Sequence, residues 1–132
     1  METDLKRNGE HYLDPTAYQA IRNTEPPRFP FRPIVYICSP YAGDVERNIL
    51  RARCCCRYAA DQGCIPLAPH LLLPQFLDER TERDLALFMG LALLSKCAEL
   101  WVFGETISPG MELEIRQARK KGKPIKYIYE VI

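Results

Sequence analysis

Two glutamates, Glu112 and Glu114, follow Ser-Pro-Gly at residues 108–110 and stand at the start of a predicted helix. Ser108 suits the N-cap of this helix, and Pro109 suits its first position. A carboxylate in the first turns of a helix is stabilised by the helix dipole and by free backbone N–H groups. We therefore expect such a group to be ionised at neutral pH, as a nucleophile must be, although ordinary acids that only complement the dipole occupy the same positions.

Helical geometry separates the two glutamates. The apolar positions recur at i, i+4 and i+7 and form the face that packs on a sheet: Met111, Ile115 and Ala118. At about 100° per residue, Glu112 and Glu114 flank this stripe on opposite sides. Glu112 has Arg116 four residues later, a surface pair worth about 0.3–0.5 kcal/mol, whereas Glu114 has an alanine there. Glu114 is thus the acid expected to lean over the sheet edge, and geometry alone leaves the dipole interpretation open.

Short apolar runs alternate with helical stretches through most of the chain. Strands are predicted at 34–38, 64–68, 98–103 and 124–132, and helices at 45–63, 79–97 and 111–121, with a long loop at 69–78. Asp44 and Gly63 bound the first of these helices. Strands separated by helices of this length imply βαβ crossovers, so the sequence predicts an α/β fold with a parallel sheet of four to five strands and helices on both faces.

Ligands of such sheets bind outside the carboxyl ends of the strands, which places a site in the loops at 39–44, 69–78 and 104–110. His70 follows the second strand and faces this predicted cleft, where it either contacts a ligand or is a structural loop histidine. Trp101, within the third strand, is expected in the core.

Residues 1–33 differ in composition from residues 34–132, the predicted α/β domain. A short helix is predicted after Asp14, with Pro15 at its first position, and four prolines at 24–33 predict an extended connector. We interpret residues 1–33 as an N-terminal arm.

Bulk composition excludes several classes of function. Lysine and arginine number 18 against 17 acids, so the chain has no basic field for a nucleic acid polymer. No stretch approaches the roughly 20 apolar residues of a membrane span, and the polar N-terminus has no signal-peptide core, so we expect a cytoplasmic protein without a membrane partner. The six cysteines form no CxxC pair and the two histidines have no ligand-like spacing. The cysteines are therefore expected to be reduced and mostly buried, with no metal site.

Three segments carry a family resemblance: "VYICSPYAGD", "RDLALF" and "AELWVFGETISPGMELEIRQARKKGKPI". Together they resemble the nucleoside 2-deoxyribosyltransferase superfamily, which includes the deoxynucleoside 5′-monophosphate N-glycosidases. The resemblance spans about residues 34–128. Its most specific part is the last segment, in which a strand is followed by Ser-x-Gly, then by a glutamate six residues after the serine, then by Gly-Lys-Pro.

The resemblance implies a flavodoxin-like or Rossmann-like three-layer sandwich that cleaves or transfers at the N-glycosidic bond of a nucleoside or nucleotide, without a cofactor. Glu114 matches the nucleophile that forms a covalent glycosyl-enzyme. Tyr36 matches a residue that orients the nucleophile, or is a packed strand tyrosine. Asp84 matches an acid that contacts the sugar hydroxyls or protonates the departing base, or is a solvated helix acid. The substrate-binding residues that it implies are Ser39, Tyr41, Gly43, Asp44, His70, Ser108, Gly110 and Met111, with Ser108 and helix N–H groups holding the phosphate or 5′ end.

Two positions depart from the family pattern. Ala42 stands where a phosphate-binding arginine is found, with Arg47 a possible substitute, and Arg116 stands where the family helix usually has glycine. A non-catalytic binding module for a nucleotide or an ADP-ribose derivative is therefore the alternative function, and an interaction or regulatory domain is a third. Because family sites are often completed by a neighbouring subunit, we expect a homodimer or higher oligomer, with Leu113 either in the interface or simply exposed.

Overall fold

The computed structural model of the protein describes residues 28–130. Its elements in chain order are β1 (Ile34–Cys38), α2 (Val45–Asp61), β2 (Ile65–Leu67), α3 (Pro69–Leu72), the 3-10 helix η2 (Leu73–Gln75), α4 (Arg83–Leu94), β3 (Glu99–Phe103), α5 (Pro109–Lys120) and β4 (Ile125–Ile128). The chain divides into Met1–Phe31 and Arg32–Ile132, and the account below concerns the second unit. The helix predicted after Asp14 and the first part of the proline-rich connector lie outside the described residues.

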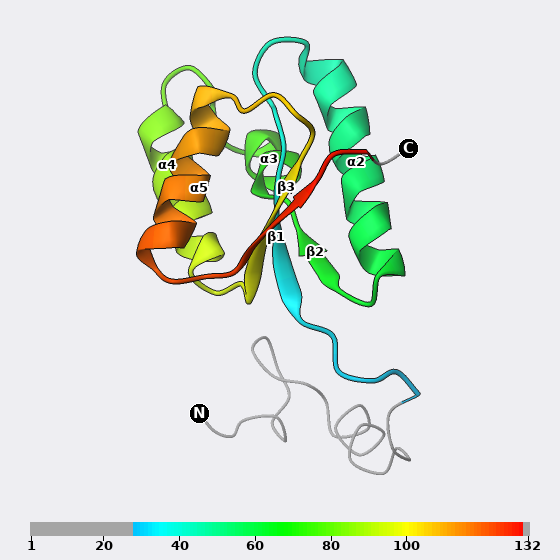
Figure 1. The fold of residues 1–132 in the computed structure, drawn as a ribbon. Helices are drawn as coiled ribbons and strands as arrows, with labels where there is room; N and C mark the ends of the chain where they lie inside the picture. Colours follow the sequence, from blue (N-terminus) through cyan, green and yellow to red (C-terminus); the bar gives the residue numbers. More distant parts are fainter. Residues whose placement is uncertain (1–27, 131–132) are drawn as a thin grey trace, which may run out of the picture. The chain divides into compact units, whose positions relative to one another are not determined.

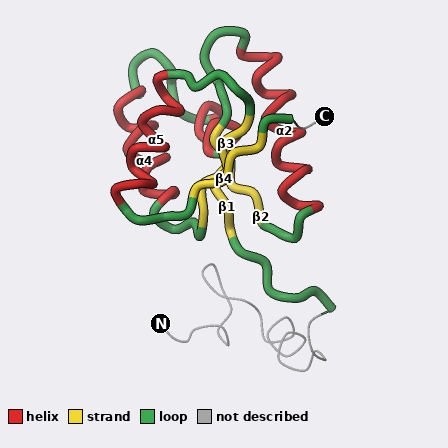
Figure 2. The backbone as a smooth tube through the Cα atoms, in the orientation of Figure 1, coloured by secondary structure: helices red, strands yellow, loops and turns green. Residues whose placement is uncertain are grey.

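The four strands form one parallel sheet in the order β2-β1-β3-β4. The central strand β1 has neighbours on both sides, and Tyr36 pairs in register with Leu67 of β2 and with Leu100 of β3. Helix α2 lies on one face of the sheet, and α4 and α5 lie together on the other (Figure 1; Figure 2). The predicted α/β sandwich with a parallel sheet is confirmed, with four strands.

The period of two along each strand divides the core into two layers. Val35 and Ile37 of β1 pack with Trp101 under α2, whereas Tyr36 and Cys38 pack on the α4–α5 side. The second layer also contains the stripe predicted on α5, because Met111, Ile115 and Ala118 are all buried. Trp101 is in the core, as predicted.

The helix boundaries follow local capping chemistry. The side chain of Asp44 accepts from the backbone N–H of Arg47 at 3.2 Å and caps α2, as predicted. The chain leaves α2 through Gly63 at φ +85°, a left-handed conformation that glycine adopts without the steric cost of a Cβ.

The predicted loop at 69–78 is wrong in part, because residues 69–75 form α3 and η2. Proline at the start of each short helix and the apolar side chain of Leu73, buried in the protein, favour these turns over an irregular loop. The helix predicted at 79–97 is shorter than expected, Arg83–Leu94. Its start is delayed because the carboxylate of Asp78 accepts from the backbone N–H groups of Arg80 and Thr81 and holds a turn there.

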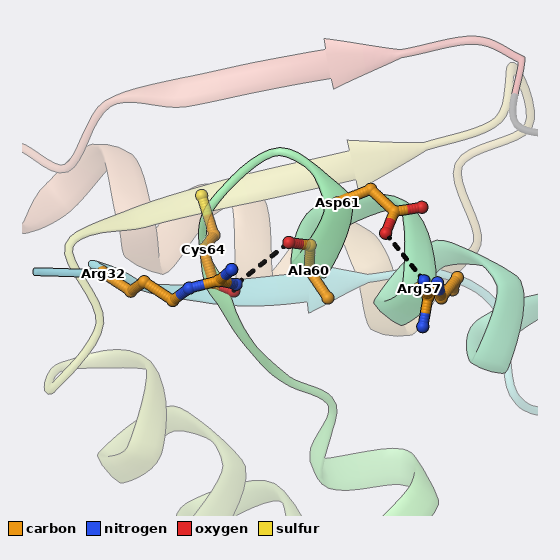
Figure 3. Close-up of polar contacts among 5 residues, drawn as sticks. All are labelled: Arg32, Arg57, Ala60, Asp61 and Cys64. Atoms are coloured by element: carbon orange, nitrogen blue, oxygen red, sulfur yellow. Dashed lines mark hydrogen bonds and ion pairs between the residues drawn. The ribbon is translucent and has the colours of Figure 1, made fainter. Parts of the chain in front are cut away.

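Arg32 ties the segment before β1 to the α2–β2 connection (Figure 3). Its guanidinium donates to the carbonyl oxygens of Ala60 at 3.0 Å and Cys64 at 3.2 Å. These carbonyls belong to the last turn of α2 and to the residue before β2, so one side chain bridges the two, although the Ala60 carbonyl also accepts from the backbone N–H of Gly63 at 3.1 Å. The nearby Arg57–Asp61 ion pair, at 3.1 Å, is exposed and contributes at most a few tenths of a kcal/mol.

All six cysteines are free, and Cys38, Cys55, Cys64 and Cys97 are buried. The prediction that the cysteines are mostly buried is thus confirmed, and none of the six is paired in a disulfide. Within residues 28–130, no helix is both long enough and apolar enough to cross a membrane.

Candidate active site

A buried tyrosine and a partly buried glutamate meet between β1 and α5. The hydroxyl of Tyr36 donates to Oε2 of Glu114 at 2.6 Å, although the two residues are 78 positions apart in the chain. Tyr36 is only 1% exposed, and it lies in the middle of the central strand. A fully enclosed side chain of the central strand therefore holds one carboxylate.

The sequence distinction between the two glutamates matches their surroundings. Glu114 flanks the buried stripe of α5 on the side that reaches Tyr36, whereas Glu112 is exposed. The expected surface pair between Glu112 and Arg116 does not form within 4.0 Å in the described part of the chain, and both side chains are exposed. Glu114 is thus the acid that the protein partly buries and holds by a hydrogen bond, and Glu112 is an ordinary first-turn acid.

Cys38 lies beside the same carboxylate. Its side chain is fully buried, two residues after Tyr36 and on the same face of β1. Its thiol donates to the carbonyl oxygen of Met111, in the first turn of α5, at a distance of 3.9 Å. Strand β1 therefore sends two donors to α5: the hydroxyl of Tyr36 to the carboxylate of Glu114, and the thiol of Cys38 to the carbonyl of Met111.

Burial raises the pKa of Glu114 above its ordinary value, while the hydrogen bond from Tyr36 and the nearby thiol of Cys38 act to lower it. The sequence argument expected the helix dipole to keep this group ionised. The difference arises because desolvation of the carboxylate outweighs both donors. Burial, and then the charge of Glu114, raise the pKa of Tyr36, so its hydroxyl is protonated and able to donate at neutral pH.

On the α4 side, Gly90 lies next to the Tyr36 hydroxyl. It is buried in the middle of α4, and a Cβ built there lies 3.4 Å from the hydroxyl oxygen of Tyr36. Glycine inside a helix costs about 1 kcal/mol relative to alanine, and at this distance a methyl group would make ordinary van der Waals contact with the hydroxyl, whereas a larger side chain would not fit. Sequence reasoning missed this residue, although a lone glycine within "LALFMGLALL" was the available signal.

Ser39 and His70 form a second polar pair, at the carboxyl ends of β1 and β2. The Oγ of Ser39 lies 2.9 Å from Nε2 of His70, and the ring of Tyr41 meets the imidazole edge-on with centroids 6.4 Å apart. Burial lowers the pKa of His70 to about 4, so the imidazole is neutral at pH 7. The structure thus brings together three of the predicted substrate-binding residues.

The first loop is shaped by its own hydrogen bonds. Gly43 has φ +98°, a conformation that side chains rarely adopt, and the carboxylate of Asp44 is engaged as the cap of α2. The side-chain amide of Asn48 donates to the carbonyls of Tyr41 at 3.1 Å and Ala42 at 2.9 Å. Asn48 therefore fixes the loop from the first turn of α2, a role that the sequence argument missed.

The loop before α5 has the predicted cap. Oγ of Ser108 accepts from the backbone N–H of Met111 at 3.2 Å, and Gly110 lies between them at the start of the helix. The side chain of Met111 is 1% exposed and belongs to the core, so any part that it plays in a site is limited to its backbone. Ser108 and Gly110 remain at the carboxyl edge, where β3 gives way to α5.

Asp84 lies in the first turn of α4 and is exposed. Helix α4 links the carboxyl end of β2, through α3 and η2, to the start of the parallel strand β3, so its N-terminus lies toward the carboxyl edge of the sheet. Gly90 follows six residues later, roughly 9 Å along the helix axis. No hydrogen bond of Asp84 to Tyr36 or Glu114 is formed among residues 28–130.

A family model described as a domain of unknown function (DUF7768) matches residues 33–128. The matched range contains the whole parallel sheet, the Tyr36–Glu114 pair and the three loops at its carboxyl edge. No curated protein matches the chain.

Proposed function

Because the chain belongs to the DUF7768 family, whose function is unknown, we propose its activity from its own site: cleavage or transfer at the N-glycosidic bond of a nucleoside or nucleotide, with Glu114 as nucleophile. The observation that carries the proposal is the 2.6 Å hydrogen bond from Tyr36 to Glu114. A carboxylate held by a buried tyrosine beside the carboxyl edge of a parallel sheet has the position and the fixed orientation that attack on a sugar carbon requires.

The reaction proceeds in two displacements. The free oxygen of Glu114 attacks the anomeric carbon, the glycosidic C–N bond breaks with its electron pair leaving on the base, and a glycosyl ester forms. Water or an acceptor base then attacks the same carbon, the ester C–O bond breaks, and the carboxylate is regenerated. With water as acceptor the protein is a hydrolase, and with a second base it is a transferase.

Each neighbouring residue has a defined part in this scheme. Tyr36 holds one carboxylate oxygen and leaves the other to react. Asp84, in the first turn of α4, contacts the sugar hydroxyls or protonates the departing base. Ser108 and the N–H groups at the start of α5 receive the 5′ end, which is where a helix dipole favours an anion. The neutral Ser39–His70 pair, with Tyr41, offers hydrogen bonds and an aromatic edge to the base.

Helix α4 supports a homodimer. Its side chains Leu85 and Leu87 are each 40% exposed and Phe88 is 69% exposed, and no charged residue occurs between Asp84 and Lys96. A helix that is apolar on nearly all sides is usually buried, and an uncharged surface suits a second identical copy. Light scattering at micromolar concentration should give a dimer, and Phe88→Glu should give a monomer. A monomeric wild type contradicts this assembly.

The six free cysteines fit the reducing cytoplasm as the site of action.

The activity is tested by chromatography after incubation with 2′-deoxynucleosides, their 5′-monophosphates and NAD. Wild type should release free base from at least one of them. Glu114→Ala should lower the rate at least 100-fold, whereas Glu112→Ala, which removes an exposed acid from the same helix, should retain it. Equal base release by Glu114→Ala and wild type eliminates the proposed nucleophile. Thermal stabilisation by a nucleotide or by ADP-ribose, without release of any base, favours the binding module instead.

A further inference from the structure

The thiol of Cys38 has a buried position that core packing alone does not explain. It is fully buried at the end of β1, and it lies between two acceptors on α5, the carbonyl oxygen of Met111 at 3.9 Å and the carboxylate of Glu114. Burial is the main cause that raises the pKa of Cys38, so the group is a protonated thiol and a hydrogen-bond donor at physiological pH.

We propose that Cys38 is a positioning residue for Glu114, whose thiol acts with the Tyr36 hydroxyl as a two-donor clamp on the nucleophilic carboxylate. Both donors stand on one face of the central strand, at positions i and i+2, so their separation is set by the pleat of β1. Two donors fix the orientation of the carboxylate plane, whereas a single donor leaves it free to rotate about the hydrogen bond. This inference rests on the proposed function.

The second acceptor gives the thiol somewhere to go during the reaction. Met111 lies three residues before Glu114 on α5, so its carbonyl and the carboxylate are on neighbouring turns of one helix face. When Glu114 is ionised, its charge makes it the stronger acceptor. When it is esterified by the sugar, its charge is lost, and the S–H bond turns to the Met111 carbonyl. The buried donor is therefore never left without a partner, which limits the cost of forming the ester.

Few other groups act on this carboxylate. Across residues 28–130, burial, Tyr36 and Cys38 account for the pKa of Glu114, and α4 faces the pair with the uncharged Gly90. Cys97 is the nearest comparison, because it is a buried thiol in the same core layer, and its Sγ donates to the carbonyl of Leu93 at 3.4 Å. Replacing Cys97 thus controls for the loss of a buried thiol that does not contact Glu114.

The test measures Glu114 directly, without a substrate. The side-chain carboxyl of Glu114 is titrated by carbon-13 NMR in the full-length wild type and in Cys38→Ala, Cys38→Ser and Cys97→Ala, with Glu114→Gln to assign the signal. Loss of the donor should raise the pKa of Glu114 in Cys38→Ala, a serine hydroxyl should restore or lower it, and Cys97→Ala should leave it unchanged. An unchanged or lowered pKa in Cys38→Ala overturns the clamp, and so does the same shift in Cys97→Ala.

The kinetic arm uses the deoxynucleoside that wild type cleaves fastest. Cys38→Ala should lower kcat about 3- to 10-fold with little change in KM, since a thiol is a weak donor, and Cys38→Ser should recover most of the loss. A loss confined to KM, or one that serine does not rescue, contradicts a positioning role. If no deoxynucleoside is cleaved, the proposed function fails while the titration still decides whether the clamp exists.

Discussion

The contribution of the hydrogen bond between Tyr36 and Glu114 to stability can be measured by a double-mutant cycle. Tyr36→Phe removes the hydroxyl and leaves the ring that fills the core, and Glu114→Ala removes the acceptor. Neither change introduces a new polar partner, which is the condition for reading the coupling as the energy of the pair. The chain contains one tryptophan, Trp101, which is buried in β3 and reports unfolding by its fluorescence.

The expected coupling follows from the geometry of the pair. A hydrogen bond to a charged group contributes about 1.5–3 kcal/mol, and one between neutral groups about 0.5–1.5 kcal/mol. Because Glu114 is partly accessible, water replaces some of the lost interaction, and the lower end of the first range applies. We therefore expect a coupling of about 1.5 kcal/mol at pH 8, by which the proposed nucleophile must be ionised, and about half of that at pH 3.5, where the raised pKa keeps the carboxyl protonated.

The assay is urea unfolding of the four proteins of the cycle at both pH values. A control cycle pairs Tyr36→Phe with Glu112→Ala, whose exposed carboxylate has no contact with the ring, and it should be additive within about 0.5 kcal/mol. A coupling near zero in the Tyr36–Glu114 cycle at pH 8 refutes the contact. A coupling equal at the two pH values refutes the ionised carboxylate as its acceptor.

Three further predictions concern other parts of the site. The wild type should lose stability as the pH falls from about 6.5 to about 4, because the imidazole of His70 takes up a proton in this range in the unfolded chain but not in the folded protein. His70→Gln should not show this loss, and equal pH profiles of the two proteins in urea unfolding contradict the prediction. Ser108→Ala should cost about 1 kcal/mol of unfolding free energy by removing the cap of α5, and an unchanged value means that the cap contributes nothing. Gly90→Ala should be neutral or stabilising by up to about 1 kcal/mol, since its methyl only touches the Tyr36 hydroxyl, whereas Gly90→Leu should lower both stability and base release. Ala92→Leu, on an exposed part of the same helix, is the control, and equal losses in the two leucine variants contradict a role for Gly90 at Tyr36.

Periodicity and caps were enough to predict the sheet and the position of Glu114. The apolar run at 34–38 became the central strand, and Asp44 and Ser108 cap the helices that they were expected to cap. The stripe on α5 separated Glu114 from Glu112 because side-chain directions on a helix follow from residue spacing alone. These are local properties, and they depend little on the rest of the chain.

The rest of the site depends on contacts between distant segments. No spacing rule connects Gly90 to Tyr36 or Ser39 to His70, since these pairs form only when separate elements pack together. The pKa of Glu114 likewise could not be predicted from the local sequence. The helix start by itself argues for a stabilised charge, but the burial that raises the pKa comes from packing of α4, α5 and β1, which the local sequence does not specify.

The central claim, that Glu114 attacks the sugar, is tested most directly by trapping the intermediate. The protein is mixed with the 2′-deoxynucleoside that it cleaves fastest, quenched with acid within the first turnover, digested, and analysed by peptide mass spectrometry. A deoxyribosyl adduct should appear on the Glu114 side chain in wild type and in Glu112→Ala, and should be absent from Glu114→Ala. Two results contradict the claim. One is base release that forms no adduct on Glu114 and continues undiminished in Glu114→Ala, and the other is no base release from any member of the substrate panel.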